Sequence, residues 1–282
     1  MRSPRPFPSR FFDRLAEHYE SHAALQTEVA ERLLSRLDGL RFEPSRIVDI
    51  GCADGRQCQA LHQRFPKARV IGIDLSTGML SQAKARRRWW RRNFELLRAD
   101  GSHLPLAEDS VDLIYANLSL GWLDDVEAAL RCWRRVLCPG GLALLSTYGP
   151  DTLRPQRARL TPPAAFSLLP DVQRLGTLLV RAGFTEPVLD TDWITTVFPS
   201  PEALLAELRG CGLLPARTRG LGKRMHKSPL QANGESSAES CRAVWEIVSA
   251  SVWAPEPGQP VRGAAGEEVS VPVDTIRVRR RD

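Results

Sequence analysis

Residues 46–57, RIVDIGCADGRQ, decide the fold of this chain. The first five residues read as a buried strand, and the acid Asp49 lies near the end of that strand. Gly51 and Gly55 then supply the backbone freedom that a tight turn and a close ligand approach require. Ala53 stands between them, where a third small glycine would be expected, and we expect its methyl group to fit with a negative φ. The unit is typical of proteins that hold a nucleotide-like cofactor.

Strand-like and helix-like segments alternate on the C-terminal side of this unit. Further strands are predicted at residues 69–75, 94–100, 111–120, 142–149, 186–198 and 242–255, and together with residues 46–50 they make seven. Helical patterns lie between most of them. This alternation predicts an α/β fold, namely a doubly wound, Rossmann-like, mostly parallel seven-stranded sheet with helices on both faces.

The chain divides into a central domain with an extension at each end. Apolar residues recur at helical spacing between positions 9 and 38, so residues 1–38 are predicted to form an N-terminal helical lid. Residues 39–253 are predicted to form the main domain, with loop or lid insertions at 150–170 and 215–240. Residues 254–282 are predicted to form a C-terminal tail.

The composition indicates a soluble protein with an acidic partner. The formal net charge is +6, and nearly all of the basic residues are arginine. The six cysteines show no C-x-x-C pair and no metal-ligand spacing, which indicates reduced thiols and no metal site. The sequence shows no signal peptide and no apolar run long enough to span a membrane. We therefore expect a cytoplasmic protein with no membrane partner.

Acidic residues close three successive predicted strands: Asp49, Asp74 and Asp100. Ligands of such sheets lie outside the carboxyl ends of the strands, so these three acids would surround one site. Asp49 can anchor an amino group, Asp74 can accept both hydroxyl hydrogens of a ribose, and Asp100 can receive the amino group of an adenine. S-adenosylmethionine carries all three parts. A dinucleotide fits less well, because G-x-G-x-x-G is missing and Asp54, expected at the helix start, would repel a phosphate.

Four segments resemble the class I S-adenosylmethionine-dependent methyltransferases: VDIGCADG, VIGIDLSTGML, LLRADGSHLPLAEDSVDLIYANLSLGWLDD and RRVLCPGGLALLSTYGPDTL. The similarity runs from about Arg46 to Leu153. It implies that Met79 flanks the adenine and that Asn117 lines the pocket after the fourth strand. The predicted cofactor-binding residues are therefore Asp49, Gly51, Gly55, Asp74, Met79, Asp100 and Asn117.

Segments outside this core, such as FFDRLAEHYESHAALQTEVAERLLSRL and STYGPDTLR, resemble the malonyl-acyl-carrier-protein O-methyltransferases. The resemblance implies methylation of the free carboxylate of a malonyl thioester on acyl carrier protein, an early step of biotin (pimeloyl) synthesis. SLLPD, residues 167–171, and residues 216–240 depart from the family pattern. Two alternatives stay open: a paralogue that methylates another small molecule, and a non-catalytic S-adenosylmethionine-binding protein.

The chemistry of such a transfer requires no general base, because a carboxylate acceptor is already ionised at neutral pH. The protein has to orient the reactants in a pocket that excludes water. The predicted catalytic residues are Tyr19, His22, Tyr148 and Arg154, with Gln26 beside the first two on the lid. Arg154 or Arg157 could pair with the malonyl carboxylate in a bidentate geometry.

The densest basic run is RRRWWRR, residues 86–92. Acyl carrier proteins are acidic, so Arg86, Arg87, Arg88, Arg91 and Arg92 could steer their docking. The run could equally be a solvated helix end whose tryptophans pack against the sheet.

A nucleic-acid methyltransferase is another class that the basic charge allows. The residues after the fourth strand read NLSL, whereas clasping the amino group of a flipped base requires an N-P-P-Y type motif. Methylation of a ring carbon would require a Pro-Cys nucleophile, and Cys138–Pro139 has the reverse order. We therefore expect no nucleic-acid partner.

Overall fold

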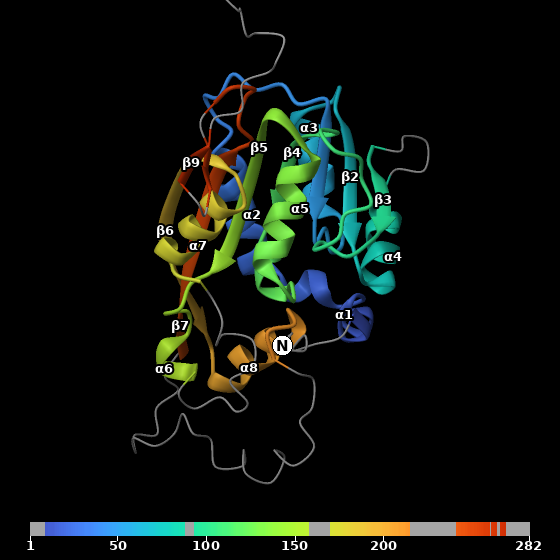
Figure 1. The fold of residues 1–282 in the computed structure, drawn as a ribbon. Coiled ribbons are helices and arrows are strands. Elements are labelled where there is room, and N and C mark those ends of the chain that lie inside the picture. The colour runs from blue at the N-terminus through green and yellow to red at the C-terminus, as the bar shows by residue number, and fades with distance from the viewer. Residues whose placement is uncertain are drawn as a thin grey trace, which may run out of the picture.

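A seven-stranded sheet with the order β3-β2-β1-β4-β5-β7-β6 forms the centre of the molecule (Figure 1). The structure, a computed structural model, describes residues 9–87, 93–157, 170–214, 241–259, 261–263 and 266–268. The strands are β1 Arg46–Ile50, β2 Arg69–Asp74, β3 Glu95–Arg98, β4 Val111–Ala116, β5 Leu137–Tyr148, β6 Thr185–Phe198 and β7 Cys241–Trp253. The predicted seven-stranded, mostly parallel α/β fold is confirmed.

The strand order places a ligand site next to β1. All strand pairs among β1 to β5 are parallel. β2 and β3 lie on one side of β1, and β4 and β5 lie on the other side, so the direction of strand succession reverses at β1. Such a reversal of strand order opens a crevice at the carboxyl ends of the strands. β7 is antiparallel to both of its neighbours, β5 and β6, which leaves β6 as one edge of the sheet and β3 as the other.

Helices cover both faces of the sheet. On one face, α5 Val126–Val136 and α7 Val172–Arg181 bury an apolar stripe, with Trp133 fully buried and its indole N–H donating to the Gly101 carbonyl oxygen at 2.7 Å. On the other face, α2 Ala24–Ser35, α3 Arg56–Arg64 and α4 Thr77–Arg86 pack on β1 and β2. The central strands β1 and β4 are therefore buried on both faces, as their continuous apolar runs predict, whereas the edge strands β3 and β6 are partly exposed.

A third apolar cluster closes the carboxyl end of the sheet. It joins α2 and α8 Pro201–Gly210 to the first half of β7, through residues such as Leu25, Leu208 and Trp245. In Figure 1, α1 Ser9–Leu15 and α8 lie at the end of the sheet toward which the β5 arrow points. Smaller elements are the 3-10 turns η1 Tyr19–His22 and η2 Leu120–Trp122, the short α6 Arg154–Arg157, and the pair β8 Val261–Gly263 and β9 Gly266–Glu268.

The N-terminal segment is helical, as predicted, but it is broken into α1, η1 and α2. The Asp13 side chain on α1 explains part of the bend, because it is held at the start of α4. One of its carboxylate oxygens accepts hydrogen bonds from the Ser76 hydroxyl at 2.6 Å and the Gly78 N–H at 2.8 Å. A carboxylate at a helix N-terminus is also favoured by the helix dipole. α1 is therefore fixed across the strand ends.

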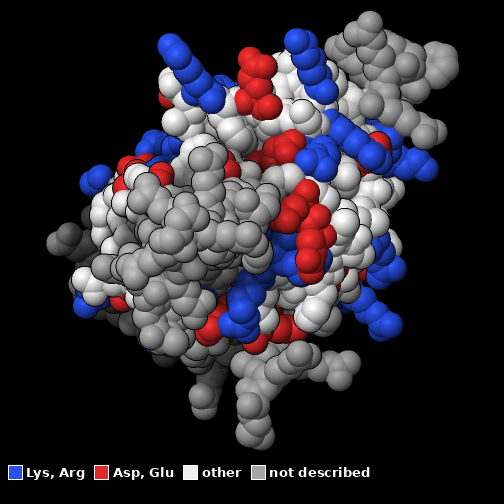
Figure 2. All heavy atoms as spheres, turned by 45° about the horizontal axis from the view of Figure 1, so that its top comes forward, with Lys and Arg blue, Asp and Glu red and all other residues white. Residues whose placement is uncertain are grey.

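The surface charges are mixed. On the face shown in Figure 2, basic and acidic side chains are interspersed over the visible part of the molecule. None of the helices in the described ranges combines the length and the apolar character that a membrane span requires.

Candidate functional site

A deep cavity lies at the carboxyl ends of β1, β2 and β4. It encloses about 1300 Å³ of empty space, including its open mouth. Its walls come from the glycine turn after β1, from the N-terminal segment, and from residues that follow β3, β4 and α8. Six of the seven predicted cofactor residues line it: Asp49, Gly51, Asp74, Met79, Asp100 and Asn117.

Gly55, the seventh predicted cofactor residue, is not part of the cavity wall. It is the N-cap of α3, with φ +77°, and a Cβ there would lie 2.8 Å from the Ala83 Cβ on α4. Gly51, with φ +75°, does face the cavity, and a Cβ there would lie 2.7 Å from the Ser119 Cβ. Gly51 therefore opens the site, whereas Gly55 allows α3 and α4 to pack closely.

Ala53 does not have the negative φ that we expected, and that prediction is wrong. Its φ is +45°, in the left-handed region that residues with a Cβ seldom adopt. Its N–H donates a 3.0 Å hydrogen bond to the Asp74 Oδ2. The turn therefore accepts local strain in order to aim a backbone donor at the acid that ends β2.

The acids of the cavity are held by the backbone and are partly desolvated. Asp74 Oδ1 accepts from the Ser76 N–H at 2.8 Å, and Asp100 Oδ1 accepts from the Ser102 N–H at 2.9 Å. Burial raises the pKa of Asp74, although its backbone hydrogen bonds act against this rise. Burial raises the pKa of Asp49 to about 7, and the neighbouring negative charges of Asp74 and Asp54 act in the same direction. A cationic ligand would relieve both effects.

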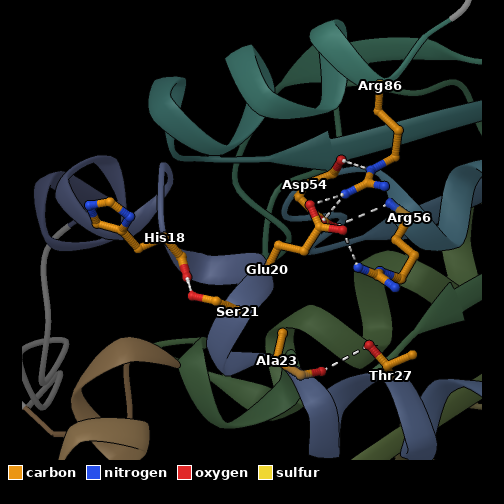
Figure 3. Close-up of polar contacts among 8 residues, drawn as sticks. All are labelled: His18, Glu20, Ser21, Ala23, Thr27, Asp54, Arg56 and Arg86. Atoms are coloured by element: carbon orange, nitrogen blue, oxygen red, sulfur yellow. Dashed lines mark hydrogen bonds and ion pairs between the residues drawn. The ribbon is translucent and has the colours of Figure 1, made fainter.

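An ionic cluster ties the N-terminal segment to the glycine turn (Figure 3). Glu20 on η1 lies between two guanidinium groups: its Oε1 is 2.6 Å from Arg56 Nη2 and its Oε2 is 3.0 Å from Arg86 Nη2. Arg86 Nη2 also lies 2.6 Å from Asp54 Oδ2. The Nε of Arg86 donates a hydrogen bond to the Asp54 carbonyl oxygen at 3.1 Å. We call these four residues the latch.

The latch corrects two sequence-based interpretations. Asp54 precedes α3, which begins at Arg56, and its charge is paired with Arg86, so it does not repel a phosphate as a bare carboxylate would. Arg86, predicted to dock a carrier protein, is engaged within the protein instead. Of the rest of the arginine run, Arg87 lies with its Cζ 5.8 Å from the centroid of the Phe94 ring. Arg88, Arg91 and Arg92 lie outside the described residues.

Tyrosine and amide side chains also line the cavity. The Asn117 Nδ2 donates to the Gln26 carbonyl oxygen at 2.8 Å, and the Gln26 Nε2 donates to the Tyr148 hydroxyl at 3.2 Å. Tyr19 also lines the cavity. Desolvation raises the pKa values of Tyr19 and Tyr148 well above 10, so both phenols keep their protons at neutral pH. They can donate hydrogen bonds but cannot act as bases.

The structure does not bring His22 or Arg154 to this cavity. His22 is turned toward α8, where its Nδ1 lies 2.9 Å from Glu207 Oε2, and it lines a second cavity. The Arg154 side chain is 78% exposed and lies 3.4 Å from Asp151. Each of the two side chains lies beside an acid outside the cavity: Glu207 for His22 and Asp151 for Arg154. The Arg157 side chain lies outside the described residues.

Some residues that line the cavity were not predicted from the sequence. Ser119 lies two residues after Asn117, and its buried Oγ has no hydrogen-bond partner among the described residues. Cys211 and Leu213 reach the cavity from the end of α8, far along the chain, and no local pattern points to them. Burial raises the pKa of the Cys211 thiol to about 12, so the thiol is protonated.

The residues present fit S-adenosylmethionine. Three acids suit its cationic amino acid, ribose and adenine groups. The bare backbone of Gly51 leaves room that a side chain would fill. These features favour a cation with hydroxyl and amino groups.

The fold is similar to that of several solved structures. A putative methyltransferase bound to the Trm112 activator from Haloferax volcanii superposes with a TM-score of 0.61 at 18% identity, covering 87% of this chain and 98% of that one. The YcgJ protein of Bacillus subtilis gives a TM-score of 0.61 at 14% identity, covering 82% of this chain and 99% of that one. At these identities the likeness shows the fold alone.

Comparison with family models and curated relatives identifies the family. The model described as "Methyltransferase domain" matches residues 48–145. Malonyl-[acyl-carrier protein] O-methyltransferases match at 36% identity in Xylella fastidiosa (97% of this chain, 96% of that one) and at 34% in Halorhodospira halophila (96% and 95%). The predicted cofactor, S-adenosylmethionine, is confirmed. This chain belongs to the malonyl-[acyl-carrier protein] O-methyltransferase family.

Proposed function

We propose that this protein methylates the free carboxylate of a malonyl group carried on acyl carrier protein, in an early step of biotin synthesis. One observation carries the proposal. A single cavity is lined both by three strand-end acids, suited to S-adenosylmethionine, and by tyrosine and amide side chains, in a chain 36% identical to a malonyl-[acyl-carrier protein] O-methyltransferase over nearly its whole length.

The reaction is a displacement at carbon. When bound, S-adenosylmethionine supplies a methyl group on a positively charged sulfur. A malonyl carboxylate oxygen forms the new O–CH₃ bond as the S–CH₃ bond breaks, and the electron pair of that bond stays on sulfur. No proton moves, because the carboxylate is ionised at neutral pH. This agrees with a cavity whose Tyr19, Tyr148 and Cys211 all keep their protons.

The task left to the protein is positioning. Asp49, Asp74 and Asp100 line the cavity, and in this proposal they would hold the cofactor. The protonated hydroxyls of Tyr19 and Tyr148, which line the same cavity, would donate hydrogen bonds to the acceptor carboxylate. Phe12 and Trp122, whose rings meet edge to face with centroids 5.1 Å apart, line the cavity and would help to exclude water from it. Holding reactants in line can account for much of the rate of such a transfer.

Intact-protein mass spectrometry of malonyl-acyl-carrier protein, after incubation with the enzyme and S-adenosylmethionine, tests the proposal. We expect the gain of one methyl group on the malonyl form and none on an acetyl-acyl-carrier-protein control. Replacing Tyr148 with phenylalanine should lower kcat about tenfold through loss of one hydrogen bond, while S-adenosylhomocysteine binds as before. No methyl gain by a protein that still binds S-adenosylhomocysteine would reject this acceptor, and would favour another acceptor or a non-catalytic role.

The proposed partner is the acyl carrier protein itself. Docking on the arginine run stays a prediction, and Arg86 no longer belongs to it because the latch engages this residue. Arg87 is the described member of the run outside the latch. A cytoplasmic location likewise stays a prediction.

A further inference from the structure

The Asp49 carboxylate differs from the other two acids of the cavity in the groups that hold it. Asp74 and Asp100 accept hydrogen bonds from backbone N–H groups. Among the residues that the structure describes, the one hydrogen-bond donor to the Asp49 carboxylate is the Cys58 thiol, whose Sγ lies 3.2 Å from Oδ2. Asp49 lines the cavity but is only 2% exposed, so this single donor has a large share in its state.

The position of the Cys58 thiol is fixed by the packing of α3 on the sheet. Cys58 lies in the first turn of α3 and is fully buried. Gly72 lies opposite Asp49 in the parallel pairing of β1 with β2, and a Cβ there would lie 2.6 Å from the Cys58 Sγ and 2.9 Å from the Cys52 Sγ. The two thiols therefore occupy the space that a side chain at position 72 would fill, and Cys58 reaches Asp49 from there.

The charges around Asp49 act against its ionised form. Burial raises its pKa, the hydrogen bond from Cys58 lowers it, and the negative charges of Asp74 and Asp54 raise it again, with a result of about 7. Burial also raises the pKa of the Cys58 thiol well above its usual value, so Cys58 keeps the proton that it donates. Near neutral pH, the Cys58 hydrogen bond therefore influences whether Asp49 carries a charge.

The other titratable groups around Asp49 are neutral. Tyr115 lies opposite Asp49 in the pairing of β1 with β4, but its hydroxyl donates to the Ala30 carbonyl oxygen on α2 at 2.8 Å, and burial raises its pKa well above the usual value. For the Cys52 thiol, a hydrogen bond from Cys58 lowers the pKa, but burial raises it to about 11. Neither group supplies a positive charge that could replace the Cys58 donor.

We propose that Cys58 is a positioning residue for the cofactor: its thiol orients the Asp49 carboxylate and keeps it ionised, so that this carboxylate accepts the ammonium group of S-adenosylmethionine. The inference rests on the part of the proposed function that assigns Asp49 to the cofactor, and it holds for any methyl acceptor. Cys58 does not line the cavity, so it acts through Asp49 and not by touching the ligand. An ammonium group is bound more strongly by a carboxylate than by a neutral carboxylic acid.

Calorimetric titration with S-adenosylhomocysteine between pH 6 and pH 8.5 tests this role, because this ligand keeps the ammonium group and does not react. In the wild-type protein the affinity should rise with pH, with a midpoint near pH 7. Cys58→Ala removes the donor and favours protonated Asp49, so the midpoint should move to about pH 8, the effect expected for one hydrogen bond to a carboxylate. The Kd of Cys58→Ala should be about fivefold above the wild-type value at pH 7 and within about twofold of it at pH 8.5.

Three further variants separate this role from a loss of packing. Cys58→Ser keeps a donor at the same place and should keep the midpoint near pH 7. Cys58→Val fills the space of the thiol without a donor, should behave as Cys58→Ala does, and replaces it if the smaller side chain prevents folding. In an Asp49→Asn background the acid is missing, so adding Cys58→Ala should not change the pH profile further.

Two results would overturn the inference. One is a midpoint that stays near pH 7 in Cys58→Ala and Cys58→Val, or a loss of affinity that is equal at every pH, as packing alone would cause. The other is an effect of Cys58→Ala that persists in full in the Asp49→Asn background. A wild-type Kd that does not change between pH 6 and pH 8.5 would also remove Asp49 from cofactor binding. Methyl transfer to malonyl-acyl-carrier protein, measured by mass spectrometry, would then show separately whether the proposed reaction itself still stands.

Discussion

Replacing Ala53 with glycine should stabilise the protein, although it removes a methyl group from the cofactor loop. Ala53 has φ +45°, and its side chain is only half-buried. The left-handed conformation is unfavourable for an L-residue with a Cβ by about 1–2 kcal/mol, and glycine does not meet this penalty.

Two smaller effects oppose the gain. Glycine makes the unfolded chain more flexible, which favours unfolding by about 0.4–1 kcal/mol. Loss of one half-buried methyl group removes about 0.4 kcal/mol of hydrophobic stabilisation, half of the value for a fully buried CH₂. The net change in the free energy of unfolding is a gain of about 0.5 kcal/mol, or about 1–2 °C in Tm for a domain of this size.

Equilibrium urea unfolding, followed by tryptophan fluorescence and by circular dichroism, measures this change. The matched control is Gly51→Ala in the same turn, where φ is +75° and the new Cβ would lie 2.7 Å from the Ser119 Cβ. Strain and overpacking together should lower its stability by about 2–4 kcal/mol. If Ala53→Gly instead destabilises the protein as Gly51→Ala does, the strain assigned to Ala53 is refuted.

Four other predictions concern cofactor binding, stability and turnover. Because burial raises the pKa of Asp49 to about 7, calorimetry should show S-adenosylhomocysteine, which keeps a cationic amino group, binding about tenfold more tightly at pH 8 than at pH 6. Asp49→Asn should abolish this pH dependence, and a persisting slope would exclude Asp49 as its source. The raised pKa also means that the folded state holds this proton more tightly than the unfolded state, so the unliganded protein should lose stability as the pH rises from about 4 to about 7. Glu20→Gln removes two ion pairs of a side chain that is 60% exposed, so we expect the free energy of cofactor binding to weaken by only about 0.5–1 kcal/mol. The Kd of S-adenosylhomocysteine should rise two- to fivefold at low salt and return to the wild-type value at high salt. The exposed Glu17→Gln should show no such effect, and a salt-independent loss in Glu20→Gln would argue against the latch. Arg154→Ala, which the sequence predicts to abolish transfer, should change the turnover of S-methyl malonyl thioester less than twofold because this side chain is 78% exposed; a loss above tenfold would return Arg154 to the site.

Local patterns in the sequence were sufficient to predict the sheet and to identify residues that lie together at one cavity. Residues 46–50 form β1 as their apolar run predicts, and Asp49, Asp74 and Asp100 meet at one cavity because parallel strands end at the same edge of a sheet. Gly51 is needed where the quoted stretch places it. These features follow from properties of neighbouring residues, which a sequence displays directly.

The tertiary structure alone decided which side chains pair with residues far away in the sequence. Glu20 pairs with Arg86 across 66 positions of sequence, His22 pairs with Glu207 across 185, and Cys211 closes a cavity that begins at Asp49. The backbone of Ala53 was also decided there, because the bond from its N–H to Asp74 helps to hold a conformation that alanine alone would avoid. Such outcomes depend on the packing of segments far apart in the chain, since the partner that satisfies a charge or a backbone donor is set by the fold and not by its neighbours in sequence.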